Sequence, residues 1–340
     1  MDALARSGGS GKVADTLAQL TAIADRFPPT SVGKVHQLLV AALGTVPERP
    51  IASARLAARV AGEPYDGARI ELFAHVREEL EGLAPSLRPV TGGPAKRRWL
   101  PFFEAYFSNY IEGTRFSVEE ALAIAVDGVV PANRPEDAHD VSATYRIVAD
   151  PDLMRQVPTD ADSFLDLLVE RHRTLMAGRP QMNPGQFKKR QNYAGGTAFV
   201  APDLLVGTLR GGWDEIDRVV DPFHRAVMMM FVVTECHPFD DGNGRLARIM
   251  TNAELVARDQ ARIIVTNSYR SNYLAGLTAV TSNASGRALV SVLDFTRRWV
   301  SAVDWSDWDR CMADLTSSNA FLDSAEAEQS GNRLRLPDPA

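Results

Sequence analysis

The sequence of 340 residues predicts an all-α fold, a helical bundle that carries one small β-hairpin. Apolar residues recur at three- and four-residue spacing through most of the chain, as Val32, Val35, Leu38 and Leu39 illustrate. One segment, residues 183–202, instead has the glycine and proline borders of a hairpin. An apolar content of 45% is enough for a sizeable core, as one large domain or two.

The periodic segments predict the helices in order. The first are expected near residues 13–26, 32–43, 67–83, 97–111, 117–127, 138–149 and 161–176. Asp221 followed by Pro222 is a good helix cap with a first-turn proline, so a further helix should begin there and end near Glu235. Later helices are expected near 271–282, 287–303 and 306–323. The last fifteen or so residues, with Pro337 and Pro339, are expected to fray.

The stretch from Pro85 to Pro94, which contains Gly92 and Gly93, divides the chain. We expect an N-terminal helical region of unknown role over 1–90, a central region with the motifs described below over 91–305, and a C-terminal helix with a tail over 306–340.

Ser7 to Lys12 invites comparison with a phosphate-binding loop. However, Arg6 stands where the first glycine of that motif belongs, Val13 stands where Ser or Thr belongs, and no expected strand precedes the segment. It is interpreted as a flexible lead-in.

Composition narrows the functional classes. The net charge of −6 does not provide the strongly basic surface that nucleic-acid binding requires. Cys236 and Cys311 are the only cysteines, which excludes a disulfide framework and fits a reducing, cytoplasmic location. No stretch has the apolar length of a membrane span, and residues 1–14 lack the apolar segment of a targeting signal. The oligomeric state is left open, with a homo-oligomer among the alternatives.

The most informative string is HPFDDGNGRLAR, residues 237–248. Gly242, Asn243 and Gly244 tolerate positive φ and let consecutive N–H groups turn inward, which forms an anion-binding nest. The apolar pattern resumes at Leu246 with helical spacing, so the nest should open a helix whose positive end faces the same anion.

Charged side chains flank this nest. Arg245 and Arg248 are three residues apart on the expected helix and could grip adjacent phosphates as planar forks. Asp241 is a hard oxygen ligand, suited to a Mg²⁺ ion that bridges phosphates. His237 has the one side chain that takes up and releases a proton near neutral pH.

This string resembles the signature of the Fic family, HxFx(D/E)GNGRxxR, and fills each of its specified positions. The resemblance covers roughly residues 98–300. It implies a Fic-type helical bundle in which 91–305 is the catalytic core. It also implies a post-translational modification: transfer of the AMP part of ATP to a Ser, Thr or Tyr hydroxyl of a target protein, with Mg²⁺ and release of pyrophosphate.

The resemblance also implies roles by position. His237 would be the general base for the target hydroxyl, and Asp241 would hold the metal. Residues Gly242, Asn243, Gly244 and Arg245 would bind the α- and β-phosphates, and Arg248 would reach the terminal phosphate. Phe239 would be an apolar plug that packs the loop against the core.

A second string, SNYIEG at residues 108–113, resembles the (S/T)xxxE(G/N) inhibitory pattern of many Fic proteins. Ser108 and Glu112 would share one face of a helix that Gly113 is well placed to end. A carboxylate in the last turn opposes the helix dipole and favours a nearby cation, which the resemblance implies is Arg248. Such a pair would leave ATP in an unreactive pose, an autoinhibited state. By itself the string also fits a surface glutamate before a capping glycine.

Residues 183–202, with Gly195 and Gly196 at their centre, match more loosely the β-hairpin flap that holds the target by strand addition in Fic proteins. The target-docking side chains expected there are Lys188, Lys189, Arg190, Gln191 and Asn192. The basic residues would be exposed and would favour acidic targets, although an ordinary solvated loop is the alternative.

Residues 268–274 resemble the segment that lines the adenine pocket of the family, with Asn272 or Tyr273 as the contact. An aromatic residue on an apolar helix face is also typical of a core.

Other functions stay open beside transfer of AMP to a protein, the chain itself included. The same site could remove AMP, with Glu112 orienting a water, or could use another nucleotide or a phosphocholine donor. A nucleotide-sensing regulatory or interaction module is the alternative from another class. The presence of His237 together with Asp241, Arg245 and Arg248 favours an enzyme.

Overall fold

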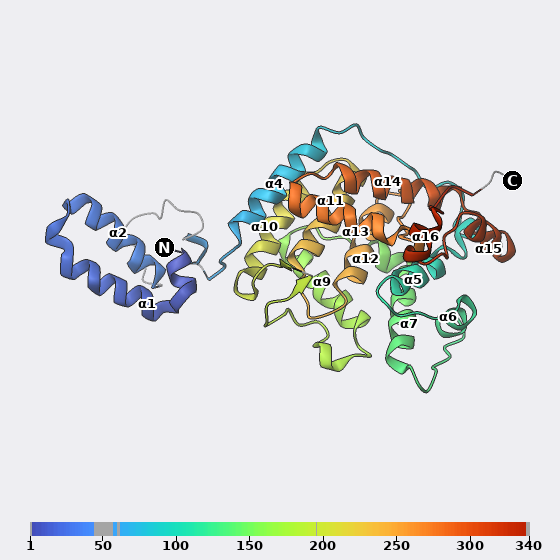
Figure 1. Cartoon of the computed structure of the whole chain (residues 1–340), viewed down its shortest axis with the longest axis horizontal. Helices are drawn as coiled ribbons and strands as arrows, with labels where there is room; N and C mark the ends of the chain where they lie inside the picture. Colours follow the sequence, from blue (N-terminus) through green and yellow to red (C-terminus); the bar gives the residue numbers. More distant parts are fainter. Residues whose placement is uncertain (1, 44–56, 60–61, 195, 338–340) are drawn as a thin grey trace.

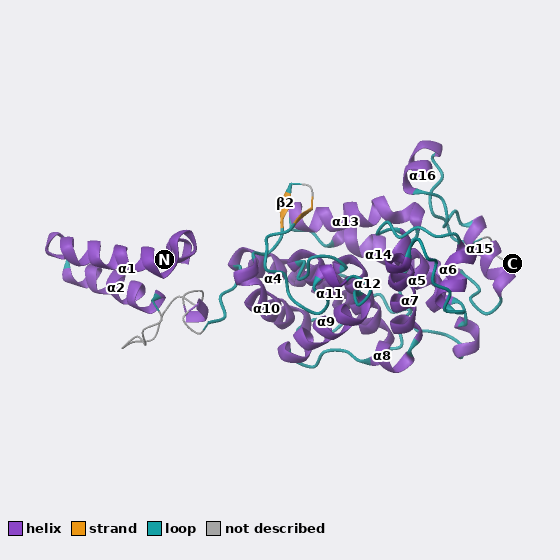
Figure 2. Cartoon of the chain, turned by 90° about the horizontal axis from the view of Figure 1, so that it is seen from below, coloured by secondary structure: helices purple, strands orange, loops and turns teal. Residues whose placement is uncertain are grey.

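The computed structural model describes residues 2–43, 57–59, 62–194 and 196–337. The expected all-α fold is confirmed, because helices form the whole scaffold of this described part (Figure 1). Its one sheet is the antiparallel pair β1 (Tyr193–Ala194) and β2 (Thr197–Ala198), which projects from the surface of the body (Figure 2). Gly195, expected at the centre of this hairpin, lies outside the described residues.

The N-terminal helices form a hairpin that stands apart from the body (Figure 1). It consists of α1 (Asp2–Ile23), the 3₁₀ turn η1 (Ala24–Arg26) and α2 (Pro29–Ala42). The flexible lead-in expected at Ser7–Lys12 is wrong, because α1 runs through it. Each glycine weakens a helix by about 1 kcal/mol, but packing of α1 against α2 offsets that loss.

The body contains the helices expected from the sequence, within about three residues at their ends except for the C-terminal end of α15. These are α4 (Gly67–Glu81), α5 (Leu100–Tyr110), α6 (Val118–Ala125), α7 (Pro135–Ala149), α9 (Ala161–Leu175), α11 (Pro222–Cys236), α12 (Asn243–Val256), α13 (Arg270–Asn283), α14 (Arg287–Ala302) and α15 (Trp308–Ser317). The sequence missed α8 (Pro151–Arg155), α10 (Leu205–Asp217) and α16 (Ser324–Ser330). Short 3₁₀ turns are η2 (Pro94–Arg97), η3 (Pro180–Met182), η4 (Pro202–Leu204) and η5 (Asn267–Tyr269).

Helix α10 was missed because it contains Gly207, Gly211 and Gly212, which lower helix propensity. In the structure these glycines let α10 approach its neighbours closely. A methyl group at Gly211 would collide with Ile70 of α4, and one at Gly212 with Val232 of α11. Close packing therefore replaces propensity as the source of this helix's stability.

Helix α11 forms the centre of the body. Asp221 caps its first turn by accepting from Phe223 N (3.0 Å) and His224 N (2.8 Å), as the sequence predicted. Its side chains are buried almost throughout, and its most extensive packing is against α12. The loop between these two helices is thus anchored at both ends in the core.

The C-terminal segment is more ordered than expected. Helix α15 ends at Ser317, before the expected residue 323, and α16 follows it. Leu334 is buried, and Arg335 donates from its N to Ser318 O (3.1 Å). The expected fraying is therefore wrong for residues 326–337, because an apolar residue returns to the core; Pro339 lies outside the described residues.

Helix α4, within the N-terminal region expected over 1–90, packs against α10 and α11.

In the described ranges, no helix combines the length and the apolar character that crossing a membrane requires.

Candidate functional site

The loop from His237 to Gly242 joins α11 to α12. His237 is the C-cap of α11 and adopts a left-handed conformation with φ of 47°, which is unfavourable for a residue with a Cβ. Its N donates to Val233 O at 3.0 Å. The buried helix therefore delivers His237 to the start of the loop, as the sequence predicted.

The imidazole of His237 is held between an aromatic ring and a carbonyl. It stacks on Phe199, with ring centroids 3.9 Å apart and an interplanar angle of 6°. Its Nδ1 lies 3.4 Å from Thr234 O. Burial lowers the pKa of His237 to about 4, against the raising effect of the Thr234 carbonyl. The ring is therefore neutral at pH 7, and a proton on Nδ1 facing Thr234 leaves the lone pair on Nε2.

Phe239 fixes the middle of the loop. It is fully buried and stacks on His172 with centroids 3.7 Å apart. The His172 ring accepts from Gly185 N at Nδ1 (2.9 Å) and lies 3.0 Å from Asp241 O through Nε2. Burial lowers the pKa of His172 to about 4, so this ring also is neutral at pH 7. Phe239 thus has the packing role that was expected of it.

Asn243 braces the same loop with its side chain. Its Oδ1 accepts from Phe239 N (2.9 Å) and its Nδ2 donates to Phe239 O (2.8 Å). The side chain is consequently occupied by the loop, which leaves the backbone N–H as the part of Asn243 that could meet an anion.

Helix α12 begins at Asn243, directly after Gly242 with φ of 75°. No side chain in the described part of the chain caps this helix, and its first backbone bond runs from Leu246 N to Gly242 O (3.0 Å). Uncapped amides at the positive end of a buried helix form an anion site. Of the three residues of the expected nest, only Gly242 has a positive φ, because Asn243 and Gly244 already belong to α12.

Asp241 lies at the rim of this nest with its side chain 46% exposed. Its Oδ1 accepts from Gly242 N at 2.6 Å, and its Oδ2 is 3.9 Å from Arg245 Nη2. Among the described residues no group of three or more His, Cys, Asp or Glu side chains is arranged to hold a metal. A metal here would need ligands in addition to Asp241.

Arg245 is buried and already paired. Its Nη1 lies 2.9 Å from Asp140 Oδ2 and donates to Asn109 Oδ1 at 3.4 Å. Asp140 is 1% exposed and is also bound by Arg179, whose Nη2 is 2.9 Å away. The guanidinium that was expected to contact phosphates is thus directed at α5 and α7.

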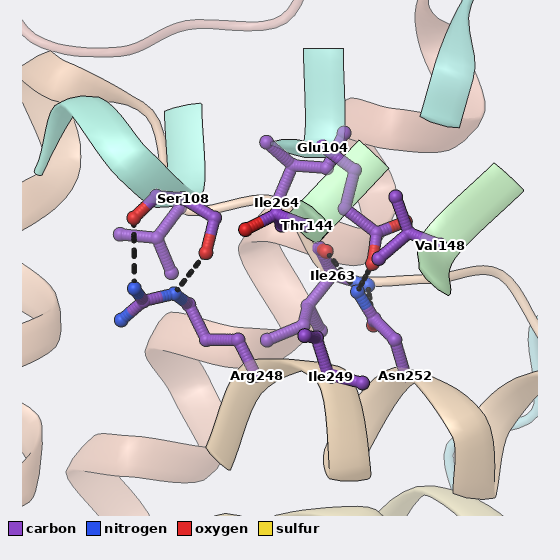
Figure 3. A pocket seen from close by; sticks show the side chains of 10 residues that line it. Glu104, Ser108, Thr144, Val148, Arg248, Ile249, Asn252, Ile263 and Ile264 are labelled. Atoms are coloured by element: carbon purple, nitrogen blue, oxygen red, sulfur yellow. Dashed lines mark hydrogen bonds between the residues drawn. The ribbon is translucent and has the colours of Figure 1, made fainter. Parts of the chain in front are cut away.

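Arg248 makes the ion pair that the sequence predicted. Its Nη2 donates to Glu112 Oε1 at 2.7 Å. The same Nη2 donates to Ser108 O at 2.9 Å, and Nε donates to Ser108 Oγ at 3.0 Å (Figure 3). The adjoining cavity, lined by Ser108, Arg248 and Asn252 among others, has a volume of about 10 Å³. Such a space holds about one water, so no nucleotide fits there.

Glu112 follows the end of α5, and the chain turns away at Gly113 with φ of 100°. The Glu112 carboxylate lies directly against Gly244, where an added methyl group would collide with Oε1. Its side chain is 38% exposed. The carboxylate therefore occupies the position over the first turn of α12 at which an anion was expected.

Three of the five side chains expected on the flap, Lys188, Gln191 and Asn192, contact the chain itself. Lys188 was expected to be exposed but is only 3% exposed, and burial lowers its pKa to about 8. Its Nζ donates to Asn192 Oδ1 (2.6 Å) and Cys236 O (3.1 Å), bonds that compensate for its removal from water. Lys189 and Arg190 are exposed, as expected.

The other two flap residues also contact the chain itself. Gln191 Nε2 donates to Phe199 O at 2.6 Å. Asn192 Nδ2 donates to His237 O at 3.1 Å and to Phe239 O at 3.0 Å. Gln191 thus joins the segments before and after the hairpin, and Asn192 braces the loop; both residues are half-buried.

The two residues expected at an adenine pocket lie in different environments. Asn272 is exposed, whereas Tyr273 is 2% exposed with its hydroxyl 3.2 Å from Met230 Sδ. The Tyr273 ring lies 6.0 Å from the Arg248 guanidinium carbon. Tyr273 is therefore a core residue beside Arg248, which agrees with the alternative interpretation of this segment.

Sequence reasoning missed His172 and Asp140, which hold Asp241 and Arg245. A lone histidine or aspartate on a helix gives no signal of its partner. The one available cue was that each lies on the inner face of an amphipathic helix, where an unpaired polar group would be costly.

Part of the chain is similar to a known family. Residues 162–255 match the model described as the Fic/DOC family. Protein adenylyltransferase fic-1 of Caenorhabditis elegans is 27% identical over 184 residues, which are 52% of this chain and 36% of that protein. Protein adenylyltransferase Fic of Culex quinquefasciatus is 24% identical over 59% of this chain and 41% of its own length. The chain thus spans less than half the length of these relatives.

Solved structures agree in fold. A Fic domain-containing signalling protein from Bacteroides thetaiotaomicron has a TM-score of 0.54 at 20% identity, over 70% of this chain and 95% of that one. A segment of Fic-1 from C. elegans has a TM-score of 0.51 at 19% identity, over 84% and 80% of the two chains. At such identities the likeness concerns the helical architecture alone.

Proposed function

We propose that this chain, which belongs to the Fic/DOC family, transfers the AMP part of ATP to a hydroxyl side chain of a target protein. The observation that carries the proposal is the placement of a neutral His237 at the loop that opens onto the uncapped first turn of α12. The curated relatives are named protein adenylyltransferases, which supports the same activity.

The chemistry follows from the state of His237. Its unprotonated Nε2 accepts the proton of the target hydroxyl, and the oxygen attacks the α-phosphorus of ATP. The bond between the α-phosphorus and the bridging oxygen breaks, and pyrophosphate leaves. Because the pKa of His237 is lowered to about 4, the base is available throughout the neutral pH range. Positioning and charge neutralisation supply most of the rate in such reactions.

The first turn of α12 would receive the phosphates. The backbone amides of Asn243, Gly244 and Arg245 point toward them, and the helix dipole favours their charge. Asp241, with a half-exposed carboxylate at the rim, would hold a Mg²⁺ ion, since that ion commonly binds one or two carboxylates together with substrate phosphates and water. Bound there, Mg²⁺ would neutralise phosphate charge.

We also propose that Glu112 inhibits the chain. Its carboxylate holds Arg248 and lies over Gly244, so it takes both the cation and the space that the phosphates of ATP would use. In the structure this pair forms within one chain. Displacement of Glu112 would free Arg248 for the terminal phosphate.

The target would dock on the β1–β2 hairpin. An exposed two-stranded edge can add a third strand from an extended peptide. Lys189 and Arg190 are exposed beside it and would favour acidic segments. We place the chain in a reducing, cytoplasmic environment on the basis of its two free cysteines.

Removal of AMP from a modified protein is the second candidate. The observation that favours it is the partly exposed Glu112 carboxylate beside the phosphate position, which could orient a water. Mass spectrometry of a modified and an unmodified substrate, each incubated with the protein, separates the two activities by the gain or loss of AMP.

The test of the proposal is the variant His237→Ala in a Glu112→Gly background, incubated with labelled ATP. We expect transfer of label to fall by about 10²–10⁴-fold, since the base is lost, while ATP binding persists. His36→Ala, which removes an exposed histidine of α2, is the matched control and should transfer as the background does. Undiminished labelling by the His237 variant would refute the role of the base. ATP binding without transfer by the background protein would favour a nucleotide sensor.

A further inference from the structure

The residues just before the hairpin bind every backbone carbonyl from Cys236 to Phe239. Lys188 Nζ donates to Cys236 O (3.1 Å), and Lys188 N donates to Pro238 O (2.9 Å). Asn192 Nδ2 donates to His237 O (3.1 Å) and Phe239 O (3.0 Å). Two residues thus satisfy four successive carbonyls, and Lys188 Nζ also binds Asn192 Oδ1 (2.6 Å).

These bonds have a physical reason. The last carbonyls of α11 have no partner within the helix, and the left-handed conformation of His237 is unfavourable for a residue with a Cβ. An ammonium group at the negative end of a helix is favoured by the helix dipole. Lys188, buried at the end of α11, supplies both a donor and that charge.

The chain returns from the hairpin on the other side of the same histidine. Phe199, next to β2, stacks on the His237 ring with centroids 3.9 Å apart. Two hydrogen bonds join Phe199 to the segment before the hairpin. Phe199 N donates to Asn192 O (3.2 Å), and Phe199 O accepts from Gln191 Nε2 (2.6 Å). The segment before the hairpin therefore holds the backbone of His237, and the segment after it holds the ring.

We propose that Lys188 and Asn192 are positioning residues that lock His237 in its working orientation and fix the hairpin relative to it. A target strand added to the hairpin would then meet the imidazole at a set distance. This inference rests on the proposed function, and it gives Lys188 and Asn192 a role inside the chain in place of the target contact expected from the sequence. Contact with the target is left to exposed residues such as Lys189 and Arg190.

The experiment compares Lys188→Met with Lys96→Met, both in the Glu112→Gly background. Methionine keeps an unbranched side chain but removes the ammonium donor, and Lys96 is an exposed lysine far along the chain from the hairpin. Because a displacement of about 1 Å can cost about 10²-fold, we expect the kcat of self-modification to fall by about 10–100-fold in Lys188→Met. The KM for ATP should change by less than about threefold, since a positioning residue does not contact the nucleotide.

A spectroscopic measurement makes the result independent of transfer. NMR titration of the His237 ring should give a higher pKa in Lys188→Met than in Lys96→Met, because a positive charge beside the imidazole is lost. Glu112 and Asp241, which act in the opposite direction on that pKa, are the other charged groups around the ring; the titration is therefore repeated with Glu112 restored. Asn192→Ala, which removes three side-chain hydrogen bonds of a half-buried residue, serves as the second variant if Lys188→Met does not fold.

The outcomes separate the two proposals. A kcat within about twofold of the Lys96→Met control, or a loss confined to the KM for ATP, would overturn the positioning role. An unchanged His237 titration in both Lys188→Met and Asn192→Ala would do the same. A shifted titration in a protein whose parent transfers no AMP would retain the structural link and reject the proposed function.

Discussion

Arg245 and Arg248 lie three residues apart on α12, and both guanidinium groups are buried against a carboxylate. Their partners differ. Asp140 stands in the middle of α7, is 1% exposed and is shared with Arg179. Glu112 stands beyond the end of α5, is 38% exposed and has an ion pair with Arg248 alone among the described residues.

This difference shows how one kind of interaction serves two purposes. Removal of Asp140 would leave the buried Arg245 without its close carboxylate partner, so that pair is the fixed one. Arg179 would keep its ion pairs with Glu136 and Asp137. The Glu112 side chain can rotate toward the solvent with the loss of one hydrogen bond, so its ion pair with Arg248 can be released. The helix proposed to bind the phosphates thus has one fixed ion pair and one that can open.

The largest expected effect tests the fixed pair. Asp140→Asn keeps the shape of the side chain but removes its charge, and we expect the free energy of unfolding to fall by about 3–5 kcal/mol. Glu112→Gln should change it by no more than about 1 kcal/mol, because the Glu112 carboxylate is itself partly exposed to water. Urea unfolding of the two variants measures both values. Equal losses would mean that the two pairs are equivalent.

The releasable pair is tested by activity. Glu112→Gly should raise self-modification or target modification by about 10–100-fold, because a charged hydrogen bond worth about 1.5–3 kcal/mol no longer holds Arg248. Labelled ATP with the purified protein and a cell lysate measures the increase. Glu112→Gln, which keeps the backbone unchanged, should give most of the activation.

The Glu112→Gly variant also allows the role of Arg248 to be tested. Arg248→Ala added to Glu112→Gly should reduce transfer again, since the contact with the terminal phosphate is lost. A fully active double variant would show that Arg248 is not a phosphate ligand, and unchanged activity of Glu112→Gly would remove the inhibitory role of Glu112.

The releasable pair could be predicted from the sequence, and the fixed pair could not. Ser108, Glu112 and Arg248 lie in two short strings whose spacing carries the signal, and the long periodic helices place those strings reliably. Asp140 has no such string. Its partners Arg179 and Arg245 are distant in the sequence, and only packing of α7 against α9 and α12 brings them together.

The errors have related causes. Lys188 was expected at the surface, where lysine usually lies, but its ammonium group is buried because it donates to Cys236 O at the end of α11 and to Asn192 Oδ1. Helix α10 was missed because its glycines lower propensity while permitting close contact. In both places, contacts between segments that are distant in the sequence override the average behaviour of the residue type, and the local sequence pattern does not show such contacts.

The smallest expected effect is that of salt on the two ion pairs. Raising the ionic strength from about 0.1 M to about 1 M shortens the screening distance from about 10 Å to about 3 Å. The partly exposed pair of Glu112 with Arg248 should weaken, so the ratio of Glu112→Gln activity to parent activity should fall by about twofold. Salt effects on ATP binding act on both proteins and cancel in that ratio. Because Asp140 is buried, the loss of stability in Asp140→Asn should hardly change over the same range; an equal salt dependence of both pairs would contradict the distinction drawn between them.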